Sequence, residues 1–391
     1  MMTKWSSHLK KYDNCVQPIA EVSIAGKAWS SETILITNID VSLSVGPEAS
    51  TCTVEFSTTL PDVEDGTLSI DDDFAKVKLG VDIEISLGYF AEGLFGLSAE
   101  VTEVFIGYVC DIEIKVREGK QAVLIVKGMD AKVWMMPSQI IELKKEKTKI
   151  SDVVADTLSD FSGKIKGKTI KIDGEPELER PIWQMNESHY EFLCRLAELS
   201  GCFFYISLGK LYFTSVSELQ SDGVELSPGV GIHELDVTIS IWGQHKEVTH
   251  VSLDPKDFTK KIESKVTSSS ITKYGDGKAP TSLTSNISAS CARSIVDYSI
   301  ASAAEAKFRS EALYNKTAID LVQGKFLVAG IPDITVASGL ETSDCGEPID
   351  NTYIITKIQH HCNISNREYT TEIEASSSKV NPLTASLLSL F

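Results

Sequence analysis

The chain has 391 residues, of which 42% are hydrophobic and 24% are charged, and its formal net charge is −18. This length and composition favour two or three globular domains and exclude a disordered chain. So acidic a surface repels phosphate and anionic lipid, which argues against general nucleic-acid or membrane-surface binding and leaves room only for a local basic patch at Lys144, Lys145, Lys147 and Lys149.

The eight cysteines are scattered, with no C-x-x-C pair and no zinc-ligand spacing. We expect them to be reduced core residues of a protein made in the cytoplasm. The N-terminus lacks the apolar core of a signal peptide, and no apolar run approaches the length of a membrane span. The sequence therefore predicts no signal peptide and no membrane anchor.

The first third of the chain is predicted to be β-rich. Residues 1–15 are expected to form a polar N-terminal arm. Alternating or apolar segments separated by Gly, Pro and Ser turns then predict a barrel or sandwich. The predicted strands are 18–24, 34–45, 52–56, 79–89, 101–109, 110–116 and 121–128, with a hairpin turn at 117–120.

An acidic segment, Asp62–Asp73, interrupts these strands. A calcium site is conceivable there, but the spacing is not that of an EF-hand loop and no Glu closes it. A solvated loop is the favoured interpretation.

The middle of the chain changes character. Residues 140–150 are rich in Lys and Glu and are expected to form a connector, followed by a short helix over 151–161. The segment Gly163–Thr169 ends like a phosphate loop. Its first Gly lies one residue further along the chain than the phosphate-loop motif requires, and the residues that follow predict a strand rather than a helix. We therefore interpret the segment as a false match to that motif.

Residues 183–213 are the most informative stretch. After a polar lead-in, Ser188 and Glu191 have the spacing of a capping box, and apolar residues then recur at helical spacing up to Gly201. Strands are expected over 202–206 and 211–214, joined by a tight turn. The pattern alone is compatible with an ordinary α+β core element.

The last third is predicted to return to β-structure. Strands over 237–242 and 247–253 flank a turn at Gly243, and the Ser/Thr/Gly-rich residues 264–288 are expected to form an exposed loop or insertion. The clearest helix spans 301–316, with Glu305 four residues before Arg309. Further strands are expected over 321–328, 334–337, 353–361 and 369–373. Leu383, Leu387, Leu388 and Phe391 could give the tail 381–391 an apolar face, so a frayed terminus and a docking tail are weighed equally.

A search for catalytic patterns finds no nucleophile elbow and no H-E-x-x-H motif. His360 and His361 are adjacent and would point to opposite faces of a strand, so a core histidine is favoured over a metal ligand. Paired carboxylates for sugar hydrolysis stay open, because acidic residues are abundant. We assign no catalytic, cofactor-binding or metal-binding residue and do not expect an enzyme.

The sequence of residues 183–213 resembles the signature of the tail-hub family of contractile injection machines. That family includes the late control protein D of contractile phages and the hub half of the valine-glycine repeat spike protein of type VI secretion. The matching residues are Gln184, Glu187, Ser188, Tyr190, Glu191, Phe192, Leu193, Arg195, Leu196, Ala197, Glu198, Gly201, Phe204 and Tyr205.

Looser motifs of the same family occur in the same order in both flanking regions. In the first region they include Gly88-Tyr89, with Ile83 where the family tends to carry valine. The others are Val104, Phe105, Gly107 and Val109; Leu124, Val126, Gly128 and Asp130; Gly330, Pro332 and Gly339; Tyr353, Ile355 and His360 or His361; and Tyr369, Thr370 and Thr371.

The resemblance implies a mainly β fold with a smaller α+β part: two tube-like β-barrel domains and a helix-hairpin middle domain. The implied domains are an arm 1–15, a first barrel 16–140, a middle domain 141–236, a second barrel 237–380 and a tail 381–391.

The implied function is that of a structural baseplate hub of a phage tail, bacteriocin or cellular injection system. Three copies would form a ring that adapts a threefold spike to the sixfold inner tube and nucleates tube assembly. The chain is expected to form a homotrimer. Its other expected partners are a separate spike protein with a small β-barrel and needle, inner-tube subunits and other baseplate proteins. The alternative is a cell-wall hydrolase or carbohydrate-binding β-protein associated with such a particle.

Overall fold

The computed structural model describes residues 2–30, 36–58, 77–93, 96–115, 122–144, 149–219, 222–267, 291–346 and 349–380. The acidic segment, the turn 117–120, most of the stretch 264–288 and the tail 381–391 lie outside the described residues. The expectations placed on them are therefore not addressed by the structure.

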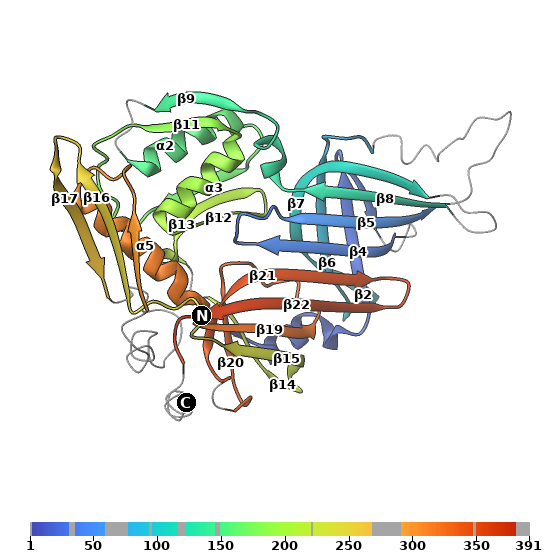
Figure 1. The fold of residues 1–391 in the computed structure, drawn as a ribbon. Coiled ribbons are helices and arrows are strands. Elements are labelled where there is room, and N and C mark those ends of the chain that lie inside the picture. The colour runs from blue at the N-terminus through green and yellow to red at the C-terminus, as the bar shows by residue number, and fades with distance from the viewer. Residues whose placement is uncertain are drawn as a thin grey trace.

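A single 14-stranded sheet forms the frame of the molecule, in the order β1-β14-β15-β19-β22-β21-β4-β5-β8-β7-β6-β2-β3, with β20 beside β14 and β21 (Figure 1). We divide it into two sheet segments. The first sheet segment runs from β4 to β3, and the second runs from β1 to β21. The fold is thus mainly β, as predicted.

The first sheet segment has seven strands and curls round on itself; it is coloured blue to cyan in Figure 1. Its strands are β2 (Pro18–Ile24), β3 (Lys27–Ser30), β4 (Ile36–Ser44), β5 (Thr51–Thr58), β6 (Asp82–Gly93), β7 (Gly96–Lys115) and β8 (Ala122–Met129). Side chains along these strands alternate between a buried and a more exposed face. In β6, for example, Ile83, Ile85 and Leu87 are fully buried, whereas Glu84 and Ser86 between them are not. The strands predicted at 101–109 and 110–116 are one strand, β7, with a bulge after Val109.

The second sheet segment is built from both ends of the chain. It contains β1 (Met2–Lys4), β14 (Gly223–Pro228), β15 (Gly231–Ile239), β19 (Val322–Ala329), β20 (Gly339–Thr342), β21 (Thr352–Asn363) and β22 (Glu368–Ser377). The last two predicted strands are confirmed as β21 and β22, and they pair with each other. Residues 334–337 were predicted as a strand, and this is wrong: residues 334 and 335 have no regular structure, and 336 and 337 form a turn with Ala337 at a φ of 65°.

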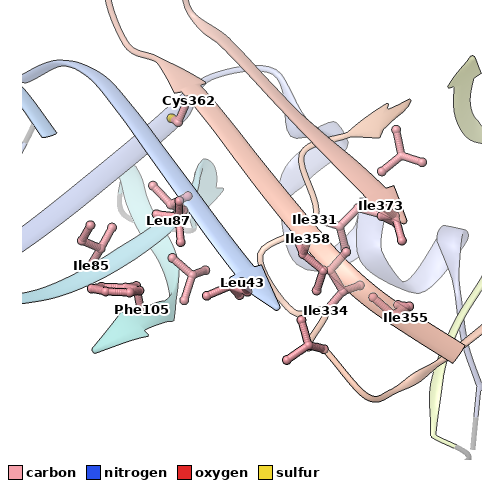
Figure 2. Close-up of a cluster of buried hydrophobic side chains, with 14 of the residues drawn as sticks. Leu43, Ile85, Leu87, Phe105, Ile331, Ile334, Ile355, Ile358, Cys362 and Ile373 are labelled. Atoms are coloured by element: carbon pink, nitrogen blue, oxygen red, sulfur yellow. The ribbon is translucent and has the colours of Figure 1, made fainter. Parts of the chain in front are cut away.

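The two sheet segments meet where β4 pairs with β21 in antiparallel register, from Ser44 opposite Lys357 to Asn38 opposite Asn363. The core is continuous across this joint. Figure 2 shows Leu43, Ile85 and Phe105 of the first segment lying near a group that includes Ile358 and Ile373 of the second, and all belong to one buried cluster. The segments therefore share a hydrophobic core as well as a sheet.

A smaller α+β part covers one end of this frame. It contains β9 (Ile140–Lys144), α2 (Ile150–Thr157), β10 (Gly167–Lys171), β11 (Ile182–Glu187), α3 (His189–Ser200), β12 (Cys202–Ser207) and β13 (Lys210–Ser215). The predicted helix and hairpin are confirmed. The segment 167–171 is a strand, in agreement with a false phosphate-loop match.

Two stretches predicted as a connector and a polar lead-in are instead strands: β9 and β11 pair to form a two-stranded ribbon. A further sheet holds β16 (Glu247–Asp254), β17 (Asp257–Val266) and β18 (Ala292–Val296), and α5 (Ala303–Ala318) packs on it. The strands flanking Gly243 were predicted as neighbours around a turn. In fact β15 pairs with β19, and β16 belongs to this other sheet.

The N-terminal residues are also different from the expected polar arm. Helix α1 (Trp5–Lys11) follows β1, and Trp5, His8 and Tyr12 are buried. Their i, i+3, i+7 spacing gives the helix one buried face. That face packs where the two sheet segments come together, so this segment is part of the folded core.

Candidate functional site

The described residues show no cluster that could hold a metal ion with three or more His, Cys, Asp or Glu side chains. All eight cysteines are free; Cys52 and Cys362 are buried as expected, but Cys110 is exposed on β7. Of the proposed basic patch, Lys144 is buried and pairs with Glu142 and Asp156 at 2.8 and 3.0 Å. The candidate functional features are therefore joints and surfaces.

The first feature is the strand joint between β4 and β21. The adjacent histidines point to opposite faces, as predicted. His360 is fully buried, and its Nδ1 lies 3.1 Å from the Thr371 hydroxyl and 3.0 Å from the Tyr369 hydroxyl. Burial lowers the pKa of His360 to about 3, so it is a neutral core residue.

His361 lies on the outer face and pairs with Asp40 directly across the joint. Its Nδ1 is 2.7 Å from the Asp40 carboxylate. This hydrogen bond raises the pKa of His361 above its ordinary value of 6.5. A hydrogen-bonded side-chain pair thus bridges the two sheet segments in the solvent-exposed layer.

The second feature is a polar network at Asp333, which links three parts of the chain. Its carboxylate accepts hydrogen bonds from Lys11 at 2.6 Å, from the Tyr12 hydroxyl at 2.9 Å and from Thr102 of β7 at 2.9 Å. Burial alone would raise the pKa of Asp333, but the hydrogen bonds from His8, Lys11, Tyr12 and Thr102 hold it well below its usual range. The N-terminal helix is thereby fixed to both sheet segments.

The third feature fixes the α+β part to the barrel. Lys132 is fully buried, and its ammonium donates to the carbonyl oxygens of Gly46, Glu48 and Phe204 at 3.1, 2.8 and 3.1 Å. Burial lowers the pKa of Lys132, while the neighbouring buried Asp130 opposes that shift. Because these donors are used internally, Lys132 acts as a structural anchor.

The signature residues of the middle stretch have structural roles as well. Ser188 and Glu191 form the predicted capping box at the start of α3, and Gly201 ends the helix at a φ of 62°. Arg195 donates to both oxygens of Glu187, at 3.1 and 3.0 Å, and to the Trp183 carbonyl oxygen. These contacts hold the ribbon strand β11 against α3.

The ribbon exposes an apolar face, which we call the ribbon face. Trp183 and Met185 of β11 lie opposite Leu143 and Ile141 of β9. Ile141 is 74% exposed, Met185 61% and Trp183 43%. Contiguous exposed apolar residues of this kind are typical of protein–protein contact surfaces. Sequence reasoning missed this face because it did not recognise either strand.

Comparison with known proteins addresses the family. A family model described as the Alg8 N-terminal domain (Alg8_N) matches residues 17–363. The chain belongs to the Alg8_N family. A sequence comparison with curated proteins found no match.

Solved structures share the fold of this Alg8_N chain. The 43 kDa tail protein of prophage MuSo2 from Shewanella oneidensis superposes with a TM-score of 0.66 at 16% identity, covering 92% of this chain and 98% of that one. An Escherichia coli type VI secretion component, described as similar to T4 phage tail proteins gp27 and gp5, gives a TM-score of 0.57 at 10% identity, with 91% and 76% covered. The Francisella PdpA–VgrG complex gives 0.54 at 11% identity, with 95% and 60% covered.

This Alg8_N chain therefore has a fold that it shares with solved tail proteins and type VI secretion proteins, which agrees with the coarse expectation drawn from the sequence resemblance. Among the described residues, no helix is both long and apolar enough to cross a membrane.

Proposed function

We propose that this chain is a structural hub of a phage tail or contractile injection particle. The observation that carries the proposal is the shared fold, which extends over 92% of the chain in the match to a prophage tail protein. The joint between β4 and β21 adds to it, because it makes one rigid unit of both sheet segments. At such low identity the likeness concerns the fold, so the role itself needs an experiment.

In this proposal the two sheet segments are two tube-like barrels, 16–140 and 237–380, around a middle domain 141–236, with an arm 1–15 and a tail 381–391. The boundary at 236/237 falls inside β15, and it would move to Gly223, because β14 and β15 both belong to the second sheet segment. Three copies would present six similar units and so match a threefold spike to a sixfold tube. Barrels of neighbouring copies would join by strand edges, which otherwise invite aggregation.

The proposed partners are those that the resemblance implies: two further copies of the chain, a separate spike protein with a small barrel and needle, inner-tube subunits and other baseplate proteins. In the particle, the chain would be incorporated into the baseplate. The hub has no catalytic step, cofactor or metal. Its action is assembly specificity and force transmission.

Copy number tests the proposal. Quantitative mass spectrometry of purified sheathed particles, referenced to the tube subunit, should find about three copies per particle, as a closed threefold ring requires. Absence from such particles would overturn the hub role and direct attention to glycan binding or hydrolysis.

The ribbon face offers a second test. A variant with Ile141→Lys and Met185→Lys should fold normally, because both side chains are exposed, yet fail to enter particles. Phe258→Lys, which alters another exposed apolar residue, is the matched control and should assemble. Normal assembly of the ribbon variant would show that this face is not covered in the particle.

A further inference from the structure

A groove of 690 Å³ lies where the frame, the α+β part and α5 meet. We call it the α3 groove. Its walls come from the turn after β4, from one side of α3, from the start of β12 and from η7 (Ile319–Leu321), which follows α5. The ribbon face is not part of it.

The α3 groove has a fixed shape. Gly46 and Phe204, whose carbonyl groups accept hydrogen bonds from Lys132, both line it. The Tyr190 hydroxyl donates to the carbonyl oxygen of Pro47 and so joins α3 to the turn after β4. A preformed groove of this kind has little freedom to lose when a segment binds in it.

The α3 groove mainly offers apolar contact. Twelve of its sixteen lining residues are uncharged, and the other four are two acidic and two basic residues, so its net charge is zero in a chain of net charge −18. Two of these charges are already used, since Glu191 caps α3 and Arg195 binds Glu187. The groove therefore favours an uncharged, apolar segment over a charged one.

Residues 381–391 have this composition. They follow Val380, where the described part of the chain stops, and they contain no charged side chain. Removal of large apolar side chains from water is favourable, so such a segment gains free energy on an apolar surface. Five of its eleven residues are of this kind: Leu383, Leu387, Leu388, Leu390 and Phe391.

The segment begins at a fixed point beside the groove. Val380 is fully buried and belongs to the same core cluster as Ile319. The Asn351 side chain donates to the carbonyl oxygen of Lys379 at 2.9 Å, and β22 contacts η7. Residue 381 therefore follows a part of the frame that borders the groove.

The length of the segment is sufficient to reach the groove. Ser377 of β22 lies opposite Val322 of β19, and Ile319 precedes Val322 by three residues. These connections place Val380 no more than about 27 Å from Ile319. Eleven extended residues span about 36 Å, so residues 381–391 can enter the groove without any change in the frame.

We propose that the leucines and the phenylalanine of residues 387–391 dock in the α3 groove of their own chain. The docked segment would act as a strap that ties the end of β22 to α3, and so the second sheet segment to the α+β part. The inference goes beyond the hub role and does not depend on it.

A cysteine of the groove allows a direct test. Cys194 lines the groove and is partly exposed, so its reaction with N-ethylmaleimide reports whether the groove is covered. In the full chain, Leu387→Ser combined with Leu388→Ser should raise the labelling rate of Cys194 about tenfold, which corresponds to about 1.4 kcal/mol of docking free energy. The matched control, Ser386→Ala combined with Ser389→Ala, keeps every large apolar side chain and should label like the native chain. Pulse labelling followed by peptide mass spectrometry gives these rates.

Two cysteines of the first sheet segment show whether the fold is intact. Cys110 is exposed and should react equally in all variants, and buried Cys52 should stay unlabelled. A synthetic peptide of residues 381–391, added to the Leu387→Ser, Leu388→Ser variant at millimolar concentration, should restore the protection of Cys194, because a tethered segment has an effective concentration of that order.

Two results would overturn the inference. The first is equal labelling of Cys194 in the native chain and in the double leucine variant. The second is protection of Cys194 that disappears when the native chain is diluted, because the docked segment would then come from a second copy of the chain.

Discussion

The Asp333 network gives the sharpest prediction about how the molecule is held together. Asp333→Asn keeps the shape of the side chain but removes the charge that receives hydrogen bonds from Lys11, Tyr12 and Thr102. Hydrogen bonds to a charged group each contribute about 1.5–3 kcal/mol when sheltered. The Asp333 side chain is 37% exposed, so solvent screening reduces the sum, and we expect a loss of about 2 kcal/mol.

This loss should appear first as local opening of the N-terminal helix, since α1 is attached to the frame through this network. A loss of about 2 kcal/mol corresponds to roughly 30-fold faster amide hydrogen exchange in residues 5–12. Hydrogen exchange followed by mass spectrometry measures it directly. Asp111→Asn is the control, because Asp111 pairs with Lys127 on the open surface and should change exchange little.

The pH dependence has a definite sign. Because the folded-state pKa of Asp333 is depressed, its contribution is present above the unfolded pKa of about 3.9 and is lost as the pH falls toward the folded value. The difference between the native chain and Asp333→Asn should be constant above about pH 5 and shrink in stronger acid. Equal exchange rates for both proteins at neutral pH would refute this account of the network.

Three further predictions concern the strand joint and the signature helix. Asp40 raises the pKa of His361, so the pair contributes its full stabilisation below about pH 6.5, and this contribution is lost as the pH rises through the raised pKa. For so exposed a pair the contribution is at most about 1 kcal/mol. The urea midpoint of the native chain should fall accordingly, and that of His361→Asn should not. Gly201→Ala should cost about 2–4 kcal/mol in urea unfolding, because φ is 62° and the added Cβ would lie 2.8 Å from the backbone of Ala312. Ser188→Ala should cost about 1 kcal/mol by the same assay through loss of the helix cap.

Controls make these predictions specific. Gly229 also has a positive φ, 71°, but nothing would lie within 4 Å of a Cβ added there. Gly229→Ala should therefore cost only the free energy of placing Ala in a left-handed backbone conformation, about 1–2 kcal/mol. An equal cost for the two glycines would contradict the close approach of α5 to Gly201. A pH-dependent midpoint in His361→Asn would assign the titration to another group.

The sequence predicts best where the physical cause is local. The capping box and Gly201 fix both ends of α3 within fourteen residues, and the alternation of β6 is visible in its own sequence. The ribbon was missed because β9 and β11 are about 40 residues apart, and their exposed Ile141 and Met185 do not follow an inside–outside pattern.

Long-range contacts explain the other differences. Helix α1 contains polar residues that suggest an arm, but the partners of His8 and Tyr12 lie more than 300 positions later, at Gly330 and Asp333. Residues 334–337 carry a strand-like pattern, yet Ala337 adopts a left-handed conformation that ends any strand.

The β4–β21 joint also has a consequence for biosynthesis. At about 5–20 residues per second, the ribosome reaches residue 363 about 15–60 s after it has completed β4. During that time the outer edge of β4 has no native partner. Asp40, which lies on that edge, is an unfavourable neighbour for a stray strand and becomes compensated when His361 arrives opposite it. The same ion pair that bridges the finished joint is thus expected to keep nascent chains from pairing with one another.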